Sequence, residues 1–569
     1  LGYGAKGTKY GRNWSIHQLP FLTFDGNNVT VKNGSTYSVK FTKPGSDYVA
    51  PYFVRDVLTY DSESDVYTLT LFTGEKKTFF GNAEGTPEAR RGLLSGMKDR
   101  HGHDIEFTYQ SESGNLEKVQ IGSGSTAVSY HYVWSSERLA NVTLQVGGSE
   151  VRKVVYSGND GNLESVTLQQ KNDAGEWDNI QQAYYRYESG GTGRMQFAFG
   201  DEACRLMAAA GINDPVTASA TEVAPYADWK LTYDACGRVD TLKTHGGKYS
   251  YSFSYQESPH YPSSNDVWKS KTTVSYPGGS TRTFYYNCPA NLLLLKVSGE
   301  GKVWYPVCQQ FDSKARVILK AASSAVASVS ESTSALFTLK TPAGLNTVLE
   351  YNGDGNLTNV SLRKGTGGSK VTQRETTYVS RPVDDLTTWL PKTVKVYREA
   401  TDSGATGEVT TSYDYEWHEP SAQMSKRTTT LPTVPTDENG DGISPVTVVE
   451  EFDEWGFLVE REDEMRVTTV FNYDREKGAM SEMVQNSGGL NLRTNYQSDK
   501  LGRITQMLGP THAVAFGGTS ESIRRAEWTQ YLDAQDEVRS IQGYVKTSNE
   551  SLATTINPVR IHRAFDTDP

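Results

Sequence analysis

The chain has 569 residues, of which 36% are apolar and 11% aromatic, and its formal charge is −11. A surface built to bind a phosphate backbone carries a basic surplus, so this acidic balance excludes nucleic acid as the partner of the whole surface. No apolar run approaches the ~20 residues that a membrane-spanning helix needs, and the apolar fraction is low for a compact α/β enzyme.

Strands dominate the expected elements from the start of the chain. The sequence holds 33 Tyr and 52 Gly, a mixture that suits twisted β-structure with many turns. Residues 1–95 are expected to form a lead-in of β-hairpins, with turns at Asn33-Gly34 and Thr73-Gly74. In the second of these, strands over 68–72 and 77–80 flank the turn.

The same pattern continues along the rest of the chain. Pairs of β-forming segments around Gly-bearing turns predict hairpins over 142–156, 242–255 and 272–286. The one good candidate for a helix is short, over 201–210. Loops are expected over 259–264, 321–334 and 431–444.

Four cysteines are present, and none belongs to a CxxC pair. The closest two are 20 residues apart, which gives no support for a zinc or thioredoxin-like site. Free thiols are favoured over disulfides, with one or two bridges as the alternative. The four are Cys204, Cys236, Cys288 and Cys308.

An internal repeat is the strongest signal in this sequence. Each copy has an aromatic residue, a few polar residues that often include Asp, a Gly, one further residue and then an aliphatic. The aromatic residues of the good copies are Tyr109, Tyr156, Tyr233, Tyr351, Phe452, Tyr473 and Tyr496, and the glycines that follow them are Gly114, Gly161, Gly237, Gly355, Gly456, Gly478 and Gly502. Weaker copies follow Tyr286 and Phe311, with Ala290 and Ala315 in place of Gly, and Tyr531 is followed by no Gly.

One hairpin per copy explains the pattern. The aromatic residue ends a strand and packs its ring on the neighbouring copy, the polar residues turn the chain, and Gly takes the positive φ of the turn. A single hairpin is marginally stable, so the copies are expected to stack into one long, curved antiparallel sheet. We therefore predict an all-β fold.

The combination of Tyr-Asp with Gly-Arg or Gly-Asn-Leu resembles the YD repeat of the Rhs family. That family includes bacterial polymorphic toxins, shell components of insecticidal toxin complexes and the barrel of the teneurins. The segment Gly11-Arg12-Asn13-Trp14-Ser15 is similar to the lead-in that precedes Rhs repeats. The resemblance covers most of the chain from about Asp99 onward, and it implies a YD-repeat shell over 96–569 that forms part of a hollow spiral.

The resemblance also implies a function. We expect a secreted or cell-surface structural segment, not an enzyme, that encloses a C-terminal cargo or toxin polypeptide and contacts neighbouring shell segments. We also expect a fragment that continues beyond residue 569. The family's self-cleavage motif, Asp-Pro-x-Gly, is not found, because Asp214-Pro215 is followed by Val216-Thr217 and Asp568-Pro569 ends the sequence. The alternative is a secreted or surface YD-repeat protein that binds a cell-surface glycan or protein in adhesion.

Other candidate sites have simpler interpretations. Asp437, Asn439 and Asp441 place oxygen atoms as in the start of a calcium loop, but Val448 stands where a bidentate Glu belongs, so a polar surface turn is favoured over a weak Ca²⁺ site. His101 and His103 share a face of a strand, yet no third metal ligand is visible and a turn is favoured.

Carboxylates and rings elsewhere are also expected to be structural. The adjacent pair Asp384-Asp385 is rejected as paired catalytic acids, since neighbouring strand residues point to opposite faces. The charged run over 460–464 is interpreted as a solvated face. The repeat tyrosines are expected in packing, with sugar stacking as the alternative. No further cofactor is expected.

Overall fold

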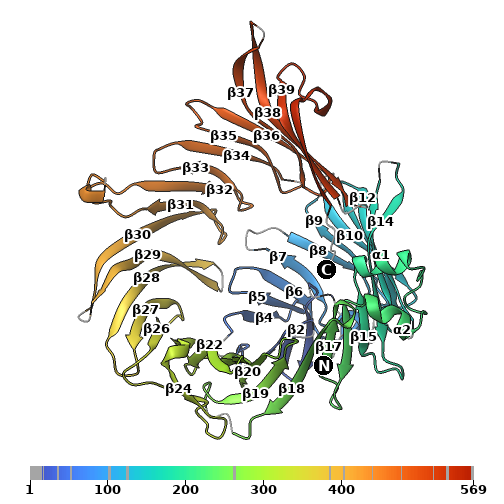
Figure 1. The fold of residues 1–569 in the computed structure, drawn as a ribbon, viewed down its shortest axis with the longest axis vertical. Coiled ribbons are helices and arrows are strands. Elements are labelled where there is room, and N and C mark those ends of the chain that lie inside the picture. The colour runs from blue at the N-terminus through green and yellow to red at the C-terminus, as the bar shows by residue number, and fades with distance from the viewer. Residues whose placement is uncertain are drawn as a thin grey trace.

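The computed structural model describes residues 10–564 except 11–13, 15, 17, 35–36, 52–53, 100–103, 124–126, 160, 173, 261–263, 384–385, 402–403, 439, 476, 517 and 534–536. A small sheet comes first, with β1 (Phe21–Asp25), β2 (Asn28–Asn33) and β3 (Tyr37–Phe41). One very long antiparallel sheet then takes up most of the remaining chain (Figure 1).

The first part of the long sheet contains β4 (Val57–Asp61), β5 (Val66–Thr70), β6 (Lys76–Phe80), β7 (Leu94–Lys98), β8 (Asp104–Tyr109), β9 (Leu116–Ile121), β10 (Val128–Ser135), β11 (Arg138–Val146), β12 (Ser149–Ser157), β13 (Ser165–Lys171), β14 (Trp177–Tyr187) and β15 (Met195–Phe199). The second part contains β16 (Trp229–Tyr233), β17 (Val239–Thr244), β18 (Tyr249–Glu257), β19 (Trp268–Ser275), β20 (Thr281–Asn287), β21 (Leu292–Gly299), β22 (Lys302–Phe311) and β23 (Val317–Ala321).

The third part contains β26 (Leu345–Tyr351), β27 (Leu357–Lys364), β28 (Lys370–Val383), β29 (Leu386–Thr401), β30 (Gly404–Trp417), β31 (Met424–Thr430), β32 (Thr447–Phe452), β33 (Leu458–Glu462), β34 (Thr468–Asp474), β35 (Ala479–Gln485), β36 (Leu492–Ser498), β37 (Ile504–Phe516), β38 (Thr519–Leu532), β39 (Glu537–Lys546) and β40 (Ile556–Ala564). Between the second and third parts, β24 (Val326–Val329) and β25 (Phe337–Leu339) form a separate two-stranded sheet.

Helices are few and short. Among the described residues, the α-helices are α1 (Asp201–Ala209) and α2 (Ala220–Val223), and the 3₁₀ turns are η1 (Glu88–Arg90), η3 (Ala224–Tyr226), η4 (His245–Gly247), η5 (Ser323–Ala325), η6 (Thr436–Glu438) and η8 (Leu552–Thr554). Within the described residues, no helix is both long and apolar enough to cross a bilayer.

Strand pairing in the long sheet follows the order of the chain. Each strand pairs with its sequence neighbours, except that β23 pairs with β26 and so bypasses the two-stranded sheet. The sheet stays open, because the described residues of β4 pair only with β5 and those of β40 only with β39. It curves through nearly a full turn, which brings its C-terminal strands beside β12 (Figure 1). These features confirm the all-β prediction and the long curved antiparallel sheet.

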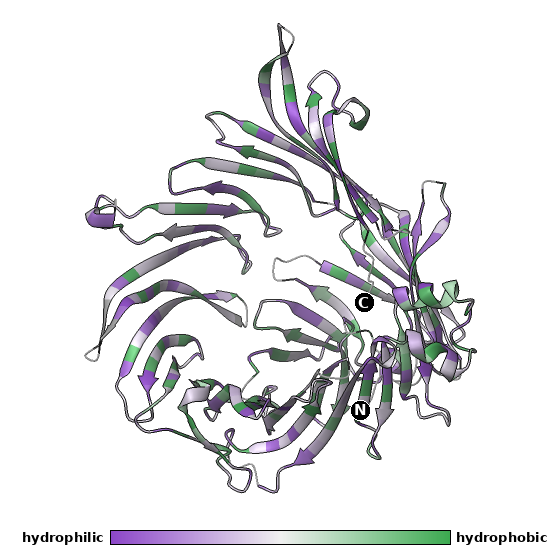
Figure 2. Ribbon diagram, viewed as in Figure 1, coloured by the Kyte–Doolittle hydropathy of each residue, from purple (hydrophilic) through white to green (hydrophobic). Residues whose placement is uncertain are grey.

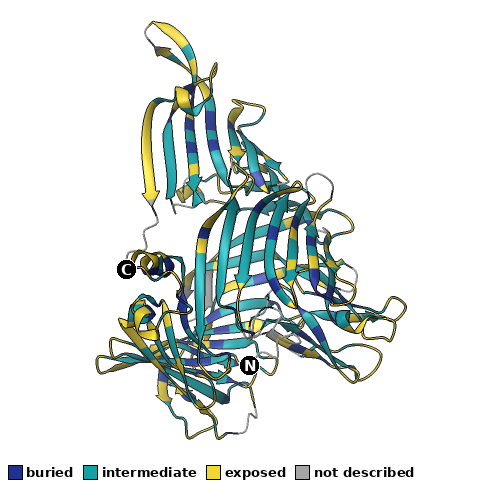
Figure 3. Ribbon diagram, turned by 90° about the vertical axis from the view of Figure 1, so that its right-hand side faces the viewer, coloured by how far each residue is buried: buried dark blue, intermediate teal, exposed yellow. Residues whose placement is uncertain are grey.

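The wall of this curve is mostly a single layer. Hydrophilic and hydrophobic residues are interspersed along the strands (Figure 2), and most strand residues are half-buried (Figure 3). Four buried clusters occur among the described residues, each where another element covers the sheet: β1–β3 over β4–β7, α1 and α2 over β15, the segment with β24 and β25 over β19–β23, and η8 over β37–β39. Strands β26–β36 contribute to none of these clusters.

The hairpins predicted from the sequence are present, and so is the predicted helix. The segments over 68–80, 142–156, 242–255 and 272–286 each form two paired strands, and α1 begins at Asp201 as expected. The loop predicted over 321–334 differs in part, because η5 and β24 lie within it. Strand pairing also runs across residue 95 without a break, and the division into 1–95 and 96–569 stays a prediction.

One irregularity in the third part is held by a buried arginine. The pairing of β37 with β38 shifts between Leu508 and Thr511, so Gly509 and Pro510 bulge out of register. The guanidinium of Arg524 donates to the carbonyls of Leu508 (2.9 Å) and Gly509 (2.6 Å). The bulge is therefore capped by a side chain from the neighbouring strand.

Candidate functional site: the repeat turns and the tyrosine ladder

An aspartate organises the turn in several of the repeats. At Asp234, Oδ1 accepts the backbone N–H groups of Cys236 and Arg238, both at 2.9 Å, and Oδ2 accepts from Nε of Arg238 at 2.8 Å. The N–H of Gly237 donates to the Asp234 carbonyl at 2.9 Å, and Gly237 has a φ of +80°. This is a tight hairpin turn closed by a bulge, and hydrogen bonds led by the Arg238 N–H lower the pKa of Asp234.

The same arrangement recurs at other copies. Asp312 accepts from the N–H groups of Lys314 and Arg316, and Asp499 accepts from those of Leu501 and Arg503. The glycines predicted from the repeat all have positive φ, from 62° to 86°: Gly114, Gly161, Gly237, Gly355, Gly456, Gly478 and Gly502.

Alanine occupies the glycine position in two weaker copies. Ala290 and Ala315 adopt φ values of +65° and +57°, so the turn imposes a left-handed conformation on residues with a Cβ atom. This conformation costs roughly 1 kcal/mol for a residue other than glycine, and that strain leads to a direct prediction.

Exchanging the two residue types at equivalent turns should change stability in opposite directions. Ala315→Gly is expected to raise the free energy of unfolding by about 0.5–1 kcal/mol, and Gly237→Ala to lower it by about the same amount. Denaturant titration of both variants measures the two effects. The same sign in both would contradict the turn geometry described above.

A hydroxyl contact joins successive copies. A tyrosine in a strand of one copy donates from its hydroxyl to a backbone carbonyl of the preceding copy, usually that of the aliphatic residue after the turn, at 2.6–3.2 Å. We call this series the tyrosine ladder, and it comprises Tyr109 to Leu94, Tyr187 to Leu163, Tyr233 to Met195, Tyr255 to Val239, Tyr351 to Val317, Tyr378 to Leu357, Tyr415 to Pro391, Tyr473 to Leu458 and Tyr531 to Ile504.

The arginine of the turn contacts the same tyrosine. Arg238 is held by Asp234 and lies 4.5 Å from the ring centroid of Tyr255, whose hydroxyl reaches the carbonyl of Val239. Equivalent contacts join Arg316 to Tyr351 (4.8 Å) and Arg503 to Tyr531 (4.2 Å). In each of these turns the arginine is therefore held both by the aspartate of its own turn and by the tyrosine ring of the next copy.

Not every predicted aromatic residue belongs to the ladder. Tyr109, Tyr233, Tyr351 and Tyr473 do, whereas Phe452 has no hydroxyl, and its carbonyl instead accepts from Nε2 of His418 at 2.8 Å. The ladder residues Tyr187, Tyr255, Tyr378 and Tyr415 are not among those predicted from the repeat motif. The motif Gly193-Arg194-Met195 would have indicated a further repeat copy, since the carbonyl of Met195 accepts from the hydroxyl of Tyr233.

Tyr156 and Tyr496 take other positions. Tyr156 pairs with Val166 on the neighbouring strand, lines a pocket with Tyr185, and has its pKa raised by burial. Tyr496 lies two residues before Ser498, which directly precedes the turn aspartate Asp499. Tyr496 therefore lies two residues before the last residue of its strand, β36, and not at the strand end.

The ladder should break in alkali. Burial raises the pKa of Tyr415 to about 12 and also raises the pKa values of Tyr233, Tyr255 and Tyr351. Because an unfolded tyrosine ionises near pH ~10, their contribution to stability is complete below that pH and is lost as the pH rises through the folded-state pKa values. Tyrosinate absorbance and circular dichroism, followed together, should change in one transition between about pH 10 and 12. Ionisation that precedes unfolding, with the fold intact, would contradict this coupling.

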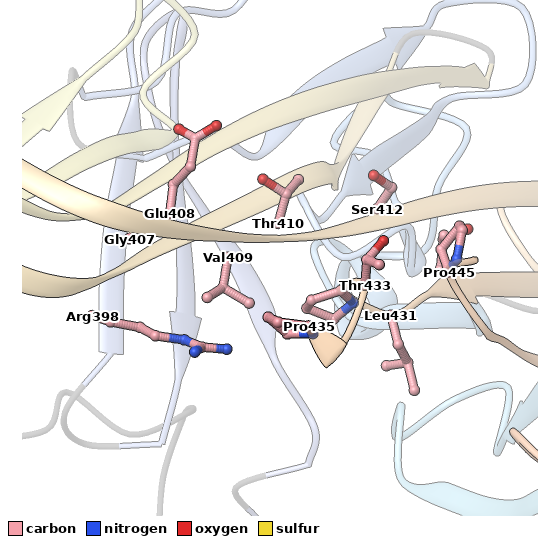
Figure 4. Close-up of a pocket in the computed structure, with 12 residues that line it drawn as sticks. Arg398, Gly407, Glu408, Val409, Thr410, Ser412, Leu431, Thr433, Pro435 and Pro445 are labelled. Atoms are coloured by element: carbon pink, nitrogen blue, oxygen red, sulfur yellow. The ribbon is translucent and has the colours of Figure 1, made fainter. Parts of the chain in front are cut away.

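The segment considered as a weak Ca²⁺ site, and expected to be a polar surface turn, lies beside a pocket. The pocket, of about 480 Å³, lies between β30 and the loop over 431–445, and Arg398, Val409 and Pro435 point toward it (Figure 4). Arg398 forms an ion pair with Glu438 at 2.7 Å, directly beside Asp437. The guanidinium of Arg398 therefore neutralises the carboxylate of Glu438, which lies next to the candidate Ca²⁺ ligand Asp437.

The predicted ligands themselves are only partly described. Asp441 accepts the N–H groups of Ile443 and Ser444 at 2.9 Å through Oδ1, which lowers its pKa. Asn439 lies outside the described residues, as do His101, His103 and the Asp384-Asp385 pair. Among the residues that are described, no group of three or more His, Cys, Asp or Glu could hold a metal ion.

The cysteines carry free thiols in this structure. Cys204 and Cys308 are buried, and Cys236 and Cys288 are exposed. Burial raises the pKa of both buried thiols to about 12. The buried pair therefore stays protonated at neutral pH.

Comparisons with known proteins find matches among solved structures. No family model and no curated protein matches the chain. Solved structures of Tc toxin components do match: TcdB2-TccC3-Cdc42 (9% identity, TM-score 0.25, 94% of this chain), the Photorhabdus luminescens Tc holotoxin pore (9%, 0.26, 94%) and TcdB2-TccC3 without its hypervariable C-terminal region (9%, 0.25, 95%). This chain spans 31–32% of the length of those chains.

Proposed function

We propose that this chain is a wall segment of a hollow shell that encloses a polypeptide cargo, carried at the C-terminal end of the same protein. The role is mechanical and needs no catalytic residue. The observation that carries the proposal is the tyrosine ladder, which joins one hairpin to the next along a curved sheet that is one layer thick over much of its length.

The distribution of buried residues supports the same role. A protein that folded around a central core would bury its largest side chains there, whereas β26–β36 contribute to none of the buried clusters. Hairpin-to-hairpin bonds stiffen such a wall without a core. An enclosing wall needs that property, because both of its faces meet water or cargo.

Cryo-electron microscopy of the full natural polypeptide tests the proposal. A shell with density inside it is expected, and the C-terminal segment should resist protease until the wall is unfolded by denaturant. A cargo segment that is digested equally fast with the wall folded and unfolded would contradict enclosure.

A second role is favoured by an exposed aromatic row. Trp229 is 54% and Tyr249 38% exposed, and both pair with Thr244, so they lie on one row across β16, β17 and β18. Exposed rings on one sheet face can stack on sugar rings, and we propose a cell-surface glycan as the alternative partner. Either role would place the chain in a secreted or surface-bound protein.

Glycan-array binding separates the two roles. Trp229→Ala should abolish binding to any glycan captured on the array, whereas Trp304→Ala, which removes an exposed ring on β22, should leave it intact. No captured glycan, or equal loss in both variants, would remove the alternative.

A further inference from the structure

The C-terminal strands of the curved sheet meet its first part, at β12, through side chains. Arg152 on β12 and Asp533, just after β38, approach to 3.5 Å between Nη2 and Oδ2, although they are far apart in the sequence. Their side chains are 27% and 20% exposed. We call this contact and its surroundings the seam.

The charged groups on both sides of the seam, Asp533 and Arg152, are held by further hydrogen bonds. Arg503 donates two hydrogen bonds, of 2.7 and 3.0 Å, to the carboxylate of Asp533. Asp499 in turn accepts from Nε of Arg503 at 2.8 Å. On the opposite side, Gln170 accepts from Nε of Arg152 at 3.1 Å and hydrogen bonds to the Asp533 carboxylate. The C-terminal part of the sheet thus presents Asp533 to Arg152 on β12, whose guanidinium is held by Gln170.

The seam is weaker than the rest of the wall. Within the described residues, no strand pairing crosses it, since β12 pairs with β11 and β13 and β38 pairs with β37 and β39. A pocket of about 290 Å³ remains between β12–β14 and the C-terminal strands, lined by residues that include Leu168, Ile180 and Val538. A gap of this kind lacks the close packing that would hold two surfaces together without charges.

We propose that the seam is an electrostatic latch: the contact of Asp533 with Arg152 and Gln170 holds the C-terminal strands against β12, and its loss lets these two parts of the wall move apart. Opening at this place would let a polypeptide enter or leave without unpairing any strand. The use of the latch rests on the proposed enclosing function, but the opening is a property of this chain alone and is measured without cargo.

Charge reversal at the seam tests the latch. Arg152→Glu sets two carboxylates against each other across the seam and leaves the bond between Arg503 and Asp533 intact. Lys153→Glu is the matched control, because it makes the same charge change one residue away, where the ammonium lies over the ring of Trp177 at 4.3 Å.

Spin labels report the distance across the seam. They are placed at Ala174 and Gln530, both exposed, after the exposed thiols are removed by Cys236→Ser and Cys288→Ser. Pulsed electron paramagnetic resonance should give one short distance for the parent chain and for Lys153→Glu, and a shift to longer distances for Arg152→Glu. The parent chain should shift in the same direction at ~1 M salt, where charges are screened beyond a few ångströms.

The salt series keeps the test valid if the reversed variant does not fold, because it needs no substitution at the seam. Unchanged distances in the parent chain at high salt, or the same distances in folded Arg152→Glu and Lys153→Glu, would overturn the latch. Cargo that is not enclosed, with salt-dependent opening still present, would reject the proposed function and leave the latch standing.

Discussion

A variant with Tyr351→Phe, Tyr378→Phe, Tyr415→Phe and Tyr473→Phe is expected to lose about 4 kcal/mol of unfolding free energy, at about 1 kcal/mol for each hydroxyl removed. Each change keeps the ring and deletes one donor to a carbonyl of the preceding copy. The effects should add, because the four contacts belong to separate copies along the wall.

Denaturant titration and amide hydrogen exchange measure this loss. Exchange should rise mainly in β26–β35, since stability in a repeat array is set by contacts between neighbours. Tyr249→Phe, on an exposed ring, is the control and should change stability by less than about 0.5 kcal/mol. A quadruple variant as stable as this control would show that the rings, and not their hydroxyls, join the copies.

Arg524→Ala is expected to cost about 3–5 kcal/mol, the range for leaving buried ionic partners unpaired. Besides the two bulge carbonyls, the guanidinium bonds to Oδ1 of Asn495 at 2.7 Å and to Oε1 of Glu550 at 3.2 Å, and the side chain is 10% exposed. Arg524→Lys should also be destabilised, because an ammonium cannot reproduce the planar fork.

The neighbouring Arg525 provides the matched control. It is exposed on the same strand, and Arg525→Ala should change the free energy of unfolding by less than about 0.5 kcal/mol. Thermal denaturation of the three variants measures the difference. Equal effects at the two positions would contradict the role assigned to the buried guanidinium.

The sequence predicted the parts of this fold that depend on nearby residues. Turn glycines, flanking β-formers and the repeated motif placed the hairpins, because a turn such as that around Gly237 is specified within a few residues. The motif also marked several aromatic residues that lie at strand ends. Even copies with alanine, such as that of Ala315, adopt the expected turn.

The parts that depend on register could not be predicted in the same way. The partner of a ladder hydroxyl is a carbonyl in the preceding copy, and its identity follows from bulges such as the shift at Tyr351. The Arg524 contacts depend on two residues bulging from another strand. The seam joins Arg152 and Asp533 only after the whole sheet has curved, and no local pattern carries that information.

Pairing between sequence neighbours has a consequence for how the chain folds. Most hydrogen-bonded partners are separated by one hairpin, so the contact order of the sheet is low for an all-β protein, and little chain entropy is lost at each step. The polypeptide can then add one hairpin at a time as it leaves the ribosome. The cost of this route is a fresh, unpaired strand edge at the end of the growing sheet, which is prone to aggregation until the next hairpin emerges.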